Sequence, residues 1–352
     1  MKLLPLKTER DVVLVLCMKA IIAHNCDKHL RTRGTHLRLK CKGMQPIGIF
    51  DSGVGGLTVA RAVIDLMPAE HIVYFGDTAR APYGSNPPEQ VLEDASRVAR
   101  YLVEEFDVKM LVIACNTTAA VLRSVAEEGS VADGEGFARD FADELAVIEI
   151  LTPGVQALLE ACNKTIKVEQ AGERVVRRAG VIATETTIAT GAYQHVLSKA
   201  LGRLTGEALD LSFVACPGFV EFAERGEVDS TEVRILAEEQ LAPLKEKQVE
   251  KLLLGCSHFP FLAEVIKDVL GEQVELVSSA EATAATVRDE LERLGLCAKE
   301  SDQSEHRGEH LWLVSGEARD FKEVGQKFLG LPMSHVESVK SLAPNIHMKG
   351  AA

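Results

Sequence analysis

The chain has 352 residues, which is enough for two α/β domains that each bury their own core. Its formal net charge of −13 argues against a nucleic-acid-binding surface as the main function. The eight cysteines show no Cys-x-x-Cys spacing, so neither a zinc site nor a disulfide framework is indicated, and we expect reduced thiols in the cytoplasm.

Residues 1–43 carry ten Lys or Arg and only three acidic residues, so they form a basic extension. Their apolar stretch at 12–23 has the length of a signal-peptide core, but Lys19 interrupts it and it is too short to span a bilayer. We expect this extension to be poorly ordered and to precede a natural start at Met44. Its cysteines and histidines match no compact metal-ligand pattern.

The first half of the chain alternates short apolar runs with amphipathic stretches, which predicts the strands and helices of a parallel sheet. A Gly-rich turn at 51–56 follows the first strand, and a polar loop at 76–88, typical of functional loops, follows the second. Residues 129–143 are interpreted as a surface insertion or a loose connection between helices. We expect strands at 47–50, 72–75, 110–114 and 146–151, and helices at 57–67, at 89–105 and from Gly154 to about Ala161.

The second half repeats this pattern after a charged stretch at 164–178, which is interpreted as a solvated insertion. It begins with a strand near Gly180, and it is followed by a tail at 336–352 that we expect to be loose. The other expected elements are strands at 211–215, 251–255 and 311–314, and helices at 188–200, 232–248, 280–294 and 321–328.

Two cysteines, Cys115 and Cys256, each end a short apolar run and are followed by small polar residues. Ligands of open α/β sheets sit at the carboxyl ends of such strands, so both thiols are placed where chemistry occurs. Each thiol follows an earlier strand at a similar remove, about 67 positions after Gly48 and about 76 after Gly180. This spacing indicates two related halves with one thiol on each side of a shared cleft.

We expect both cysteines to lie near helix N-termini, where the helix dipole and free N–H groups lower a thiol pKa. A thiolate can then act as a base as well as a nucleophile. Asp51 and His258 are candidates to assist proton transfer, although each could instead be a cap or turn residue. Two opposed acid/base groups favour racemisation or epimerisation, because a proton can leave one face of a carbon and return to the other.

The other residues give no indication of a cofactor. The turn at 51–56 could bind an anion through its N–H groups, but Thr58 stands where a dinucleotide fingerprint has glycine. The structural interpretation is preferred for Cys162, Cys216 and Cys297.

Five ordered motifs between Pro46 and Gly330 resemble the glutamate racemase family, in the cofactor-independent aspartate/glutamate racemase superfamily. The resemblance implies two pseudo-symmetric, doubly wound parallel-sheet α/β lobes with the active site in the cleft between them. We expect residues 46–148 plus 285–335 in the first lobe and 149–284 in the second. The motifs are Ile-Gly-Ile-Phe-Asp-Ser-Gly-Val-Gly-Gly-Leu-Thr from 47, Tyr-Phe-Gly-Asp-Thr-Ala-Arg-Ala-Pro-Tyr-Gly from 74, Val-Ile-Ala-Cys-Asn-Thr from 112, Gly-Val-Ile-Ala-Thr-Glu from 180 and Leu-Gly-Cys-Ser-His-Phe-Pro from 254.

The resemblance further implies interconversion of L- and D-glutamate without a cofactor or metal, with D-glutamate supplied to peptidoglycan synthesis. Cys115 and Cys256 would be the two proton donors and acceptors, and Asp51 and His258 would assist them. We also expect a cytoplasmic homodimer with L- and D-glutamate as its ligands and no membrane or direct nucleic-acid partner. The implied substrate contacts are Asp51, Ser52, Tyr83, Gly84, Asn116, Thr117, Ser257 and His258.

The chain departs from the family pattern at three places. Ser257 and Phe259 stand where many members have Thr and Tyr. Thr152 stands where part of the family has Glu, which leaves Glu149 as the nearest carboxylate. Residues 1–43 have no counterpart in the family.

Three other functions stay open. A racemase of aspartate or another amino acid is the nearest alternative, because pocket shape discriminates side-chain length. A cysteine-dependent amidase or acyl transferase would need only one of the two cysteines. A non-catalytic two-lobed protein that binds a ligand, or that regulates a DNA-processing enzyme, would keep its binding without either thiol.

Overall fold

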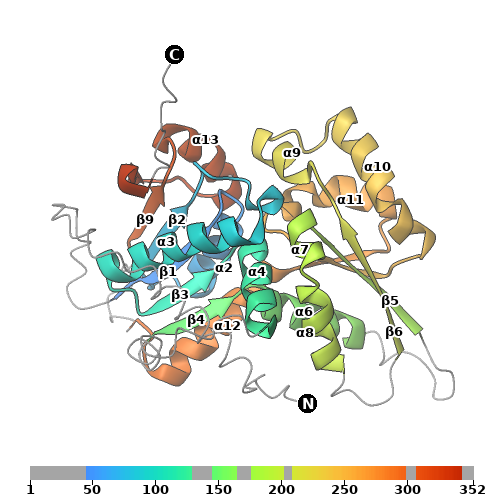
Figure 1. The fold of residues 1–352 in the computed structure, drawn as a ribbon, viewed down its shortest axis with the longest axis horizontal. Coiled ribbons are helices and arrows are strands. Elements are labelled where there is room, and N and C mark those ends of the chain that lie inside the picture. Colours follow the sequence, from blue (N-terminus) through green and yellow to red (C-terminus); the bar gives the residue numbers. More distant parts are fainter. Residues whose placement is uncertain (1–44, 129–144, 165–175, 202–207, 299–306, 343–352) are drawn as a thin grey trace.

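Two parallel β-sheets with packed helices form the protein, as a computed structural model shows (Figure 1). The predicted extension at 1–43, the insertion at 129–143 and most of the insertion at 164–178 lie outside the described residues. Within the described ranges, no helix combines the length and apolar character needed to cross a membrane. The structure describes residues 45–128, 145–164, 176–201, 208–298 and 307–342.

The first sheet has six strands in the order β10-β9-β2-β1-β3-β4, and all neighbouring strands are parallel. Its central strands β1 and β2 are buried at every position, which explains their unbroken apolar sequences. The strands are β1 (Ile47–Asp51), β2 (Ile72–Gly76), β3 (Met110–Ile113), β4 (Ala146–Glu149), β9 (His310–Val314) and β10 (Val336–Ser338).

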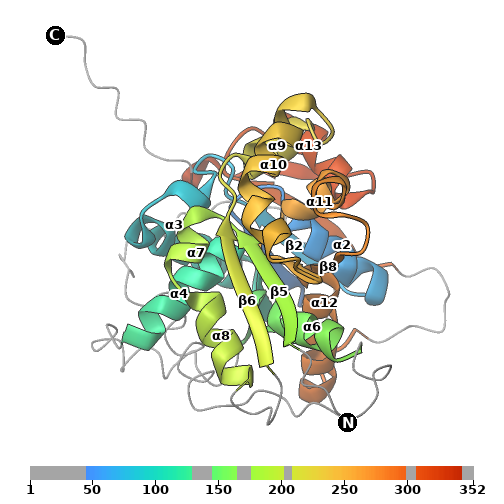
Figure 2. The same ribbon diagram turned by 90° about the vertical axis from the view of Figure 1, so that its right-hand side faces the viewer.

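The second sheet has four parallel strands in the order β6-β5-β7-β8. Its strands β5 and β6 lie side by side in Figure 2. This order matches β2-β1-β3-β4 of the first sheet, strand for strand along the chain. The match confirms the predicted pair of pseudo-symmetric α/β lobes, and it makes β3 and β7 equivalent strands. The strands of this sheet are β5 (Val176–Ala183), β6 (Ala208–Ala215), β7 (Lys251–Leu254) and β8 (Glu275–Ser278).

Most expected helices are present, but the helix predicted at 188–200 is two helices that are separated at Gly191, where φ is +66°. The sequence patterns did not predict α9 or α11, because seven and eight residues are too short for a clear helical period. They also missed β8, because only two of its four residues, Leu276 and Val277, are apolar. The helices are α2 (Leu57–Leu66), α3 (Pro88–Phe106), α4 (Asn116–Glu128), α6 (Leu151–Lys164), α7 (Glu185–Ala189), α8 (Ala192–Leu201), α9 (Phe219–Arg225), α10 (Thr231–Glu246), α11 (Ala263–Leu270), α12 (Ser279–Leu294) and α13 (Ala318–Leu329), with 3₁₀ turns η1 (Tyr83–Ser85), η3 (Phe259–Leu262) and η4 (Lys340–Leu342).

The prediction of a loose tail at 336–352 is wrong for its first seven residues, which are described. β10 pairs in parallel with β9, and the side chains of Val339 and Leu342 are buried. The sequence signal was weak because three strand residues and one 3₁₀ turn carry no periodicity.

The predicted lobe boundaries fall near helices α6 and α12, which pack against each other, and they stay a prediction.

A buried ion pair fixes the chain where it returns from the second lobe to the first. Lys109 Nζ lies 2.6 Å from Glu70 Oε2, and both side chains are almost fully buried. The Lys109 ammonium also donates to the carbonyl of Leu296, and Glu70 accepts the N–H of Ala298. The loops that precede β2 and β3, which carry Glu70 and Lys109, are thereby joined to the chain that follows α12.

Replacing Lys109 by Met should destabilise the fold, because it leaves the Glu70 carboxylate buried without its counter-charge. We expect the free energy of unfolding, measured with urea, to fall by about 3 kcal/mol or more. Lys251→Met is the matched control, since its partner Glu275 is half exposed and the loss should stay below about 1 kcal/mol. Equal losses in the two variants would contradict this role for the buried pair.

Candidate active site

The first candidate residues lie where β1 ends and the Gly-rich turn begins. Asp51 is buried, and its Oδ2 accepts the N–H of Gly53 at 3.0 Å. Its Oδ1 accepts the hydroxyl of Ser257 from the second lobe at 3.4 Å. At Gly55 a Cβ atom would come within 2.4 Å of Ser257 Oγ and His258 Nδ1, so only glycine permits this approach. The two predicted turns therefore meet across the lobe interface.

Cys115 lies between β3 and the first residue of α4, as predicted. Its side chain is 3% exposed, the N–H of Thr118 donates to Sγ at 3.5 Å, and Ser52 Oγ lies 3.7 Å from Sγ. Burial, and then the charge of Asp51, raise the pKa of the Cys115 thiol to about 12 against these hydrogen bonds. The prediction of a lowered pKa is therefore wrong for Cys115, because desolvation outweighs the helix N-terminus.

Cys256 follows the equivalent strand β7, but no α-helix begins beside it. A short 3₁₀ turn comes next, and α11 begins only at Ala263, so the prediction of a helix N-terminus is wrong here. His258 supplies a polar contact instead, with Nδ1 3.8 Å from Cys256 Sγ. The two thiols thus occupy equivalent places in the fold with different surroundings.

Glu224 on α9 completes a row of three side chains with His258 and Cys256. Its Oε1 lies 3.0 Å from His258 Nε2. Burial lowers the pKa of His258, but the contacts with Cys256 and Glu224 outweigh it and raise this pKa well above the ordinary value. The sequence analysis missed Glu224, because the short helix α9 was not predicted and a surface glutamate carries no signal.

Asn116 and Thr117 begin α4 and contact the second lobe. The Asn116 amide donates to the hydroxyl of Tyr193 at 2.8 Å, and Thr117 Oγ1 lies 3.1 Å from Thr184 Oγ1. The other amide atom, Asn116 Oδ1, is buried and has no hydrogen-bond partner within the described residues. A buried acceptor left in this way is suited to an N–H donor of a ligand.

Tyr83 and Gly84 lie in the loop after β2. The Tyr83 hydroxyl donates to Asp77 Oδ2 at 2.6 Å, so the ring, rather than the hydroxyl, faces the apolar cluster that contains Cys115. The carbonyl of Gly84 accepts the Thr186 hydroxyl at 2.8 Å. This loop therefore also joins the first thiol to the second lobe.

Glu149, the weaker carboxylate candidate, has a structural role. It accepts the N–H groups of Leu151 and Thr152 at the start of α6 and pairs with Arg123. Thr152 joins the same group of contacts through its hydroxyl. These bonds occupy both carboxylate oxygens, so Glu149 is fixed as a helix cap.

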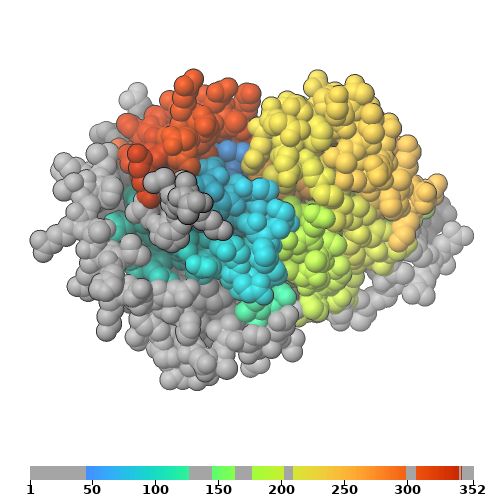
Figure 3. All heavy atoms as spheres, turned by 45° about the horizontal axis from the view of Figure 1, so that its top comes forward, coloured from blue at the N-terminus to red at the C-terminus, as the bar shows by residue number. Residues whose placement is uncertain are grey.

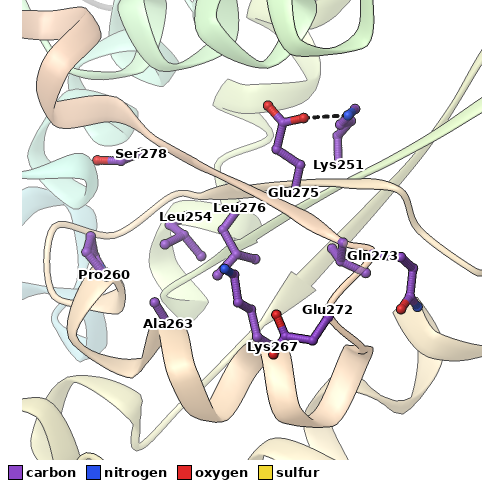
Figure 4. A pocket seen from close by; sticks show the side chains of 11 residues that line it. Lys251, Leu254, Pro260, Ala263, Lys267, Glu272, Gln273, Glu275, Leu276 and Ser278 are labelled. Carbon is purple, nitrogen blue, oxygen red and sulfur yellow. Dashed lines mark hydrogen bonds and ion pairs between the residues drawn. The ribbon is translucent and has the colours of Figure 1, made fainter. Parts of the chain in front are cut away.

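Helix α4 of the first lobe packs against α7 and α8 of the second. In the space-filling view, cyan spheres of the first lobe lie directly against yellow-green spheres of the second (Figure 3). Cys256 is 6% exposed, so both thiols are enclosed in this closed form. A cavity of about 260 Å³ reaches Glu224 and Val54. A larger one, of about 530 Å³, lies in the second lobe among Lys251, Lys267 and Ser278 (Figure 4), but its lining includes none of the candidate residues.

The site as a whole presents two buried thiols, one from each lobe, with separate polar partners. Such an arrangement can take a proton from one side of a ligand and supply one from the other. Within the described residues, no three His, Cys, Asp or Glu side chains are grouped to hold a metal ion. The side chains of all ten predicted site residues, except glycine, are buried at or near the lobe interface.

Comparisons of the sequence and of the structure with known proteins all identify racemases as similar proteins. The model of the Asp/Glu/Hydantoin racemase family matches residues 55–287. The chain is 40% identical over 300 residues to a glutamate racemase of Parafrankia sp. (strain EAN1pec), covering 85% of this chain and 96% of that protein. A solved glutamate racemase isoform of Bacillus anthracis has a TM-score of 0.67 at 32% identity, covering 84% and 97% of the two chains. One of Francisella tularensis, in complex with D-glutamate, has a TM-score of 0.66 at 29% identity with the same coverage.

Changing Asp51 and Ser52 should shift the titration of Cys115 in opposite directions. Asp51→Asn removes a charge that raises the pKa of Cys115, so alkylation of this thiol at pH 9 should become faster. Ser52→Ala removes a contact that lowers the same pKa, so alkylation should become slower. Iodoacetamide labelling followed by peptide mass spectrometry measures both rates. Shifts of the same sign in the two variants would contradict the assigned contacts.

Glu224→Gln should lower the pKa of His258, because it removes one of the two groups that favour the imidazolium. Titration of the ring ¹⁵N signals by NMR would follow this change. Glu227→Gln, just beyond the same helix, is the control, since Glu227 is exposed and pairs with Arg225. An unchanged His258 titration in Glu224→Gln would show that Glu224 does not stabilise the imidazolium.

Proposed function

The chain belongs to the Asp/Glu/Hydantoin racemase family, and we propose that it interconverts L- and D-glutamate through two cysteine thiols. It is an isomerase, specifically an amino-acid racemase, as its relatives over most of its length are. The observation that carries the two-thiol proposal is the place of Cys115 and Cys256 after the equivalent strands β3 and β7 of two lobes. An acyl transferase would have no use for the second thiol.

The proposed reaction moves one proton off the substrate and one proton on. A thiolate on one lobe takes the α-proton as the C–H bond breaks, which leaves a carbanion. The thiol of the other lobe then gives its proton to the opposite face, so the configuration is inverted and the thiolate has changed sides. Proton balance therefore requires one thiol and one thiolate in each productive enzyme form.

The surroundings of the thiols favour one of the two enzyme forms at rest. Cys115 is held as a thiol by burial and by Asp51, which suits it as the proton donor. Next to Cys256, the contacts of His258 with this sulfur and with Glu224 raise the pKa of His258 and favour its imidazolium form. In our proposal Cys115 is therefore the first proton donor, and the proton balance given above assigns the role of first base to Cys256.

Substrate binding is assigned to the polar groups around the thiols. Asn116 Oδ1 accepts the substrate ammonium, because it is a buried acceptor without a partner in the described part of the chain. Thr117 and Ser257 offer hydroxyl donors to carboxylate oxygens, and Gly84 places backbone beside them. Thr184, which contacts Thr117, is a further hydroxyl that the sequence analysis did not single out.

The cellular role follows from the product. D-glutamate is an amino acid for peptidoglycan synthesis, so we propose a role in cell-wall formation and cell shape. Two catalytic thiols must stay reduced, which favours the cytoplasm as the location. A homodimer stays part of the proposal.

Racemisation in deuterated water tests the reaction and both thiols together. We expect purified, cofactor-free protein to replace the α-proton of L- and D-glutamate with deuterium as it inverts them, followed by NMR and polarimetry. Cys115→Ala and Cys256→Ala should each lower racemisation by at least roughly 10³-fold, because each removes one acid/base group. Cys297→Ala, an exposed cysteine, is the control and should keep its activity.

Two outcomes would contradict the proposal. No turnover with glutamate but turnover with aspartate would move the protein to the aspartate-specific branch of the family. Full activity after loss of one cysteine would exclude the two-thiol mechanism.

A further inference from the structure

The loop after β2 connects the first thiol to the rest of the molecule. It begins at Asp77 and contains the 3₁₀ turn at Tyr83, whose ring packs with Cys115. The next residue, Gly84, bonds Thr186 of the second lobe. Apart from that short turn the loop has no regular structure, so its position depends on side-chain contacts.

Arg80 supplies three of these contacts. Its guanidinium lies 2.8 Å from Asp77 Oδ1 and 3.1 Å from Asp94 Oδ1 on α3, and it also donates to the carbonyl of Leu342. All three side chains of this charged group are at least nine-tenths buried. One planar group thus joins the start of the loop, the helix after it and the C-terminal 3₁₀ turn η4.

The segment that carries Leu342 is itself firmly held. β10 pairs with β9, the N–H of Val339 donates to the carbonyl of Val314 at 2.7 Å, and Leu342 is buried. A second connection runs through Ser338, whose hydroxyl donates to the carbonyl of Gly316 at 2.8 Å. The N–H of Gly316 in turn donates to Thr78 in the loop. Residues 336–342, here called the C-terminal segment, therefore contact the loop by two routes.

The geometry of Arg80 cannot be reproduced by lysine. A guanidinium directs several N–H groups in a fixed plane, so it can bond two carboxylates and a carbonyl at once. An ammonium is a compact point charge on a flexible chain, and it would keep the charge balance with Asp77 and Asp94 while losing part of this contact set. Arg80→Lys therefore tests the hydrogen-bond geometry of the guanidinium while it leaves the positive charge at position 80 unchanged.

We propose that Arg80 is a positioning residue through which the C-terminal segment holds the Tyr83–Gly84 loop against Cys115. The segment fixes the Leu342 carbonyl, Arg80 joins that carbonyl to Asp77, and Asp77 holds the hydroxyl of Tyr83. The inference extends the proposed function, because the same loop would orient glutamate. Its first test needs no substrate, so its failure is distinct from a failure to racemise glutamate.

The test measures how well the loop protects Cys115 from alkylation. Iodoacetamide labelling of Cys115 at pH 8.5 should become roughly tenfold faster in Arg80→Lys and in a chain that ends at Ser338. A chain that ends at Leu342 and the variant Arg97→Lys are the controls and should match the starting protein. Arg97 also bonds Asp94 but does not contact the loop.

Combining Arg80→Lys with the truncation at Ser338 distinguishes a role in positioning the loop from general destabilisation of the fold. The double variant should label no faster than the faster single variant, because both changes break one connection. Labelling of the buried Cys162 and Cys216 should stay constant, and the KM for glutamate should rise in the same variants. Unchanged labelling of Cys115 in Arg80→Lys, additive effects, or a parallel rise at Cys162 and Cys216 would each overturn the proposal.

Discussion

Two sulfur atoms lie in a dry interface, where the charged groups buried beside them require partners. Asp51 meets this requirement through a backbone N–H and a serine of the other lobe. His258 meets it through Glu224, and the loop near Cys115 meets it through Arg80 and two aspartates. Because burial makes an unpaired charge costly, these contacts constrain the shape of the site as much as its chemistry.

The fold repeats itself, but the chemistry around the two thiols does not. The second sheet repeats the strand order β2-β1-β3-β4 of the first, and each sulfur follows the third strand of its lobe. Cys115 then lies at the first turn of a thirteen-residue helix, close to an aspartate. Cys256 lies beside a histidine and a glutamate. The repeated fold thus gives the two thiols equivalent positions, while the neighbouring side chains give each thiol a different polar environment.

The sequence allowed the strands of both halves and the two thiols to be predicted, because buried parallel strands leave unbroken apolar runs with polar ends. The motifs around these thiols also allowed the resemblance to the glutamate racemase family to be stated from the sequence. Glu224, Arg80 and the place of Leu342 were not predicted, since each depends on a contact between residues distant in sequence. The direction of the Cys115 pKa was missed for a similar reason: a helix N-terminus is visible in a sequence, but the degree of burial beside it is not.

The contact at Gly55 has a consequence for motion. In the closed form, no carbon atom fits between this residue and the Ser257–His258 turn, and both sulfurs are shielded from water. In the proposed two-thiol reaction glutamate has to reach both buried sulfurs, so each turnover would include an opening and a closing step. A Gly55→Ala substitution would place a methyl group in this contact. It would therefore shift the conformational equilibrium of the protein from the closed form towards an open form.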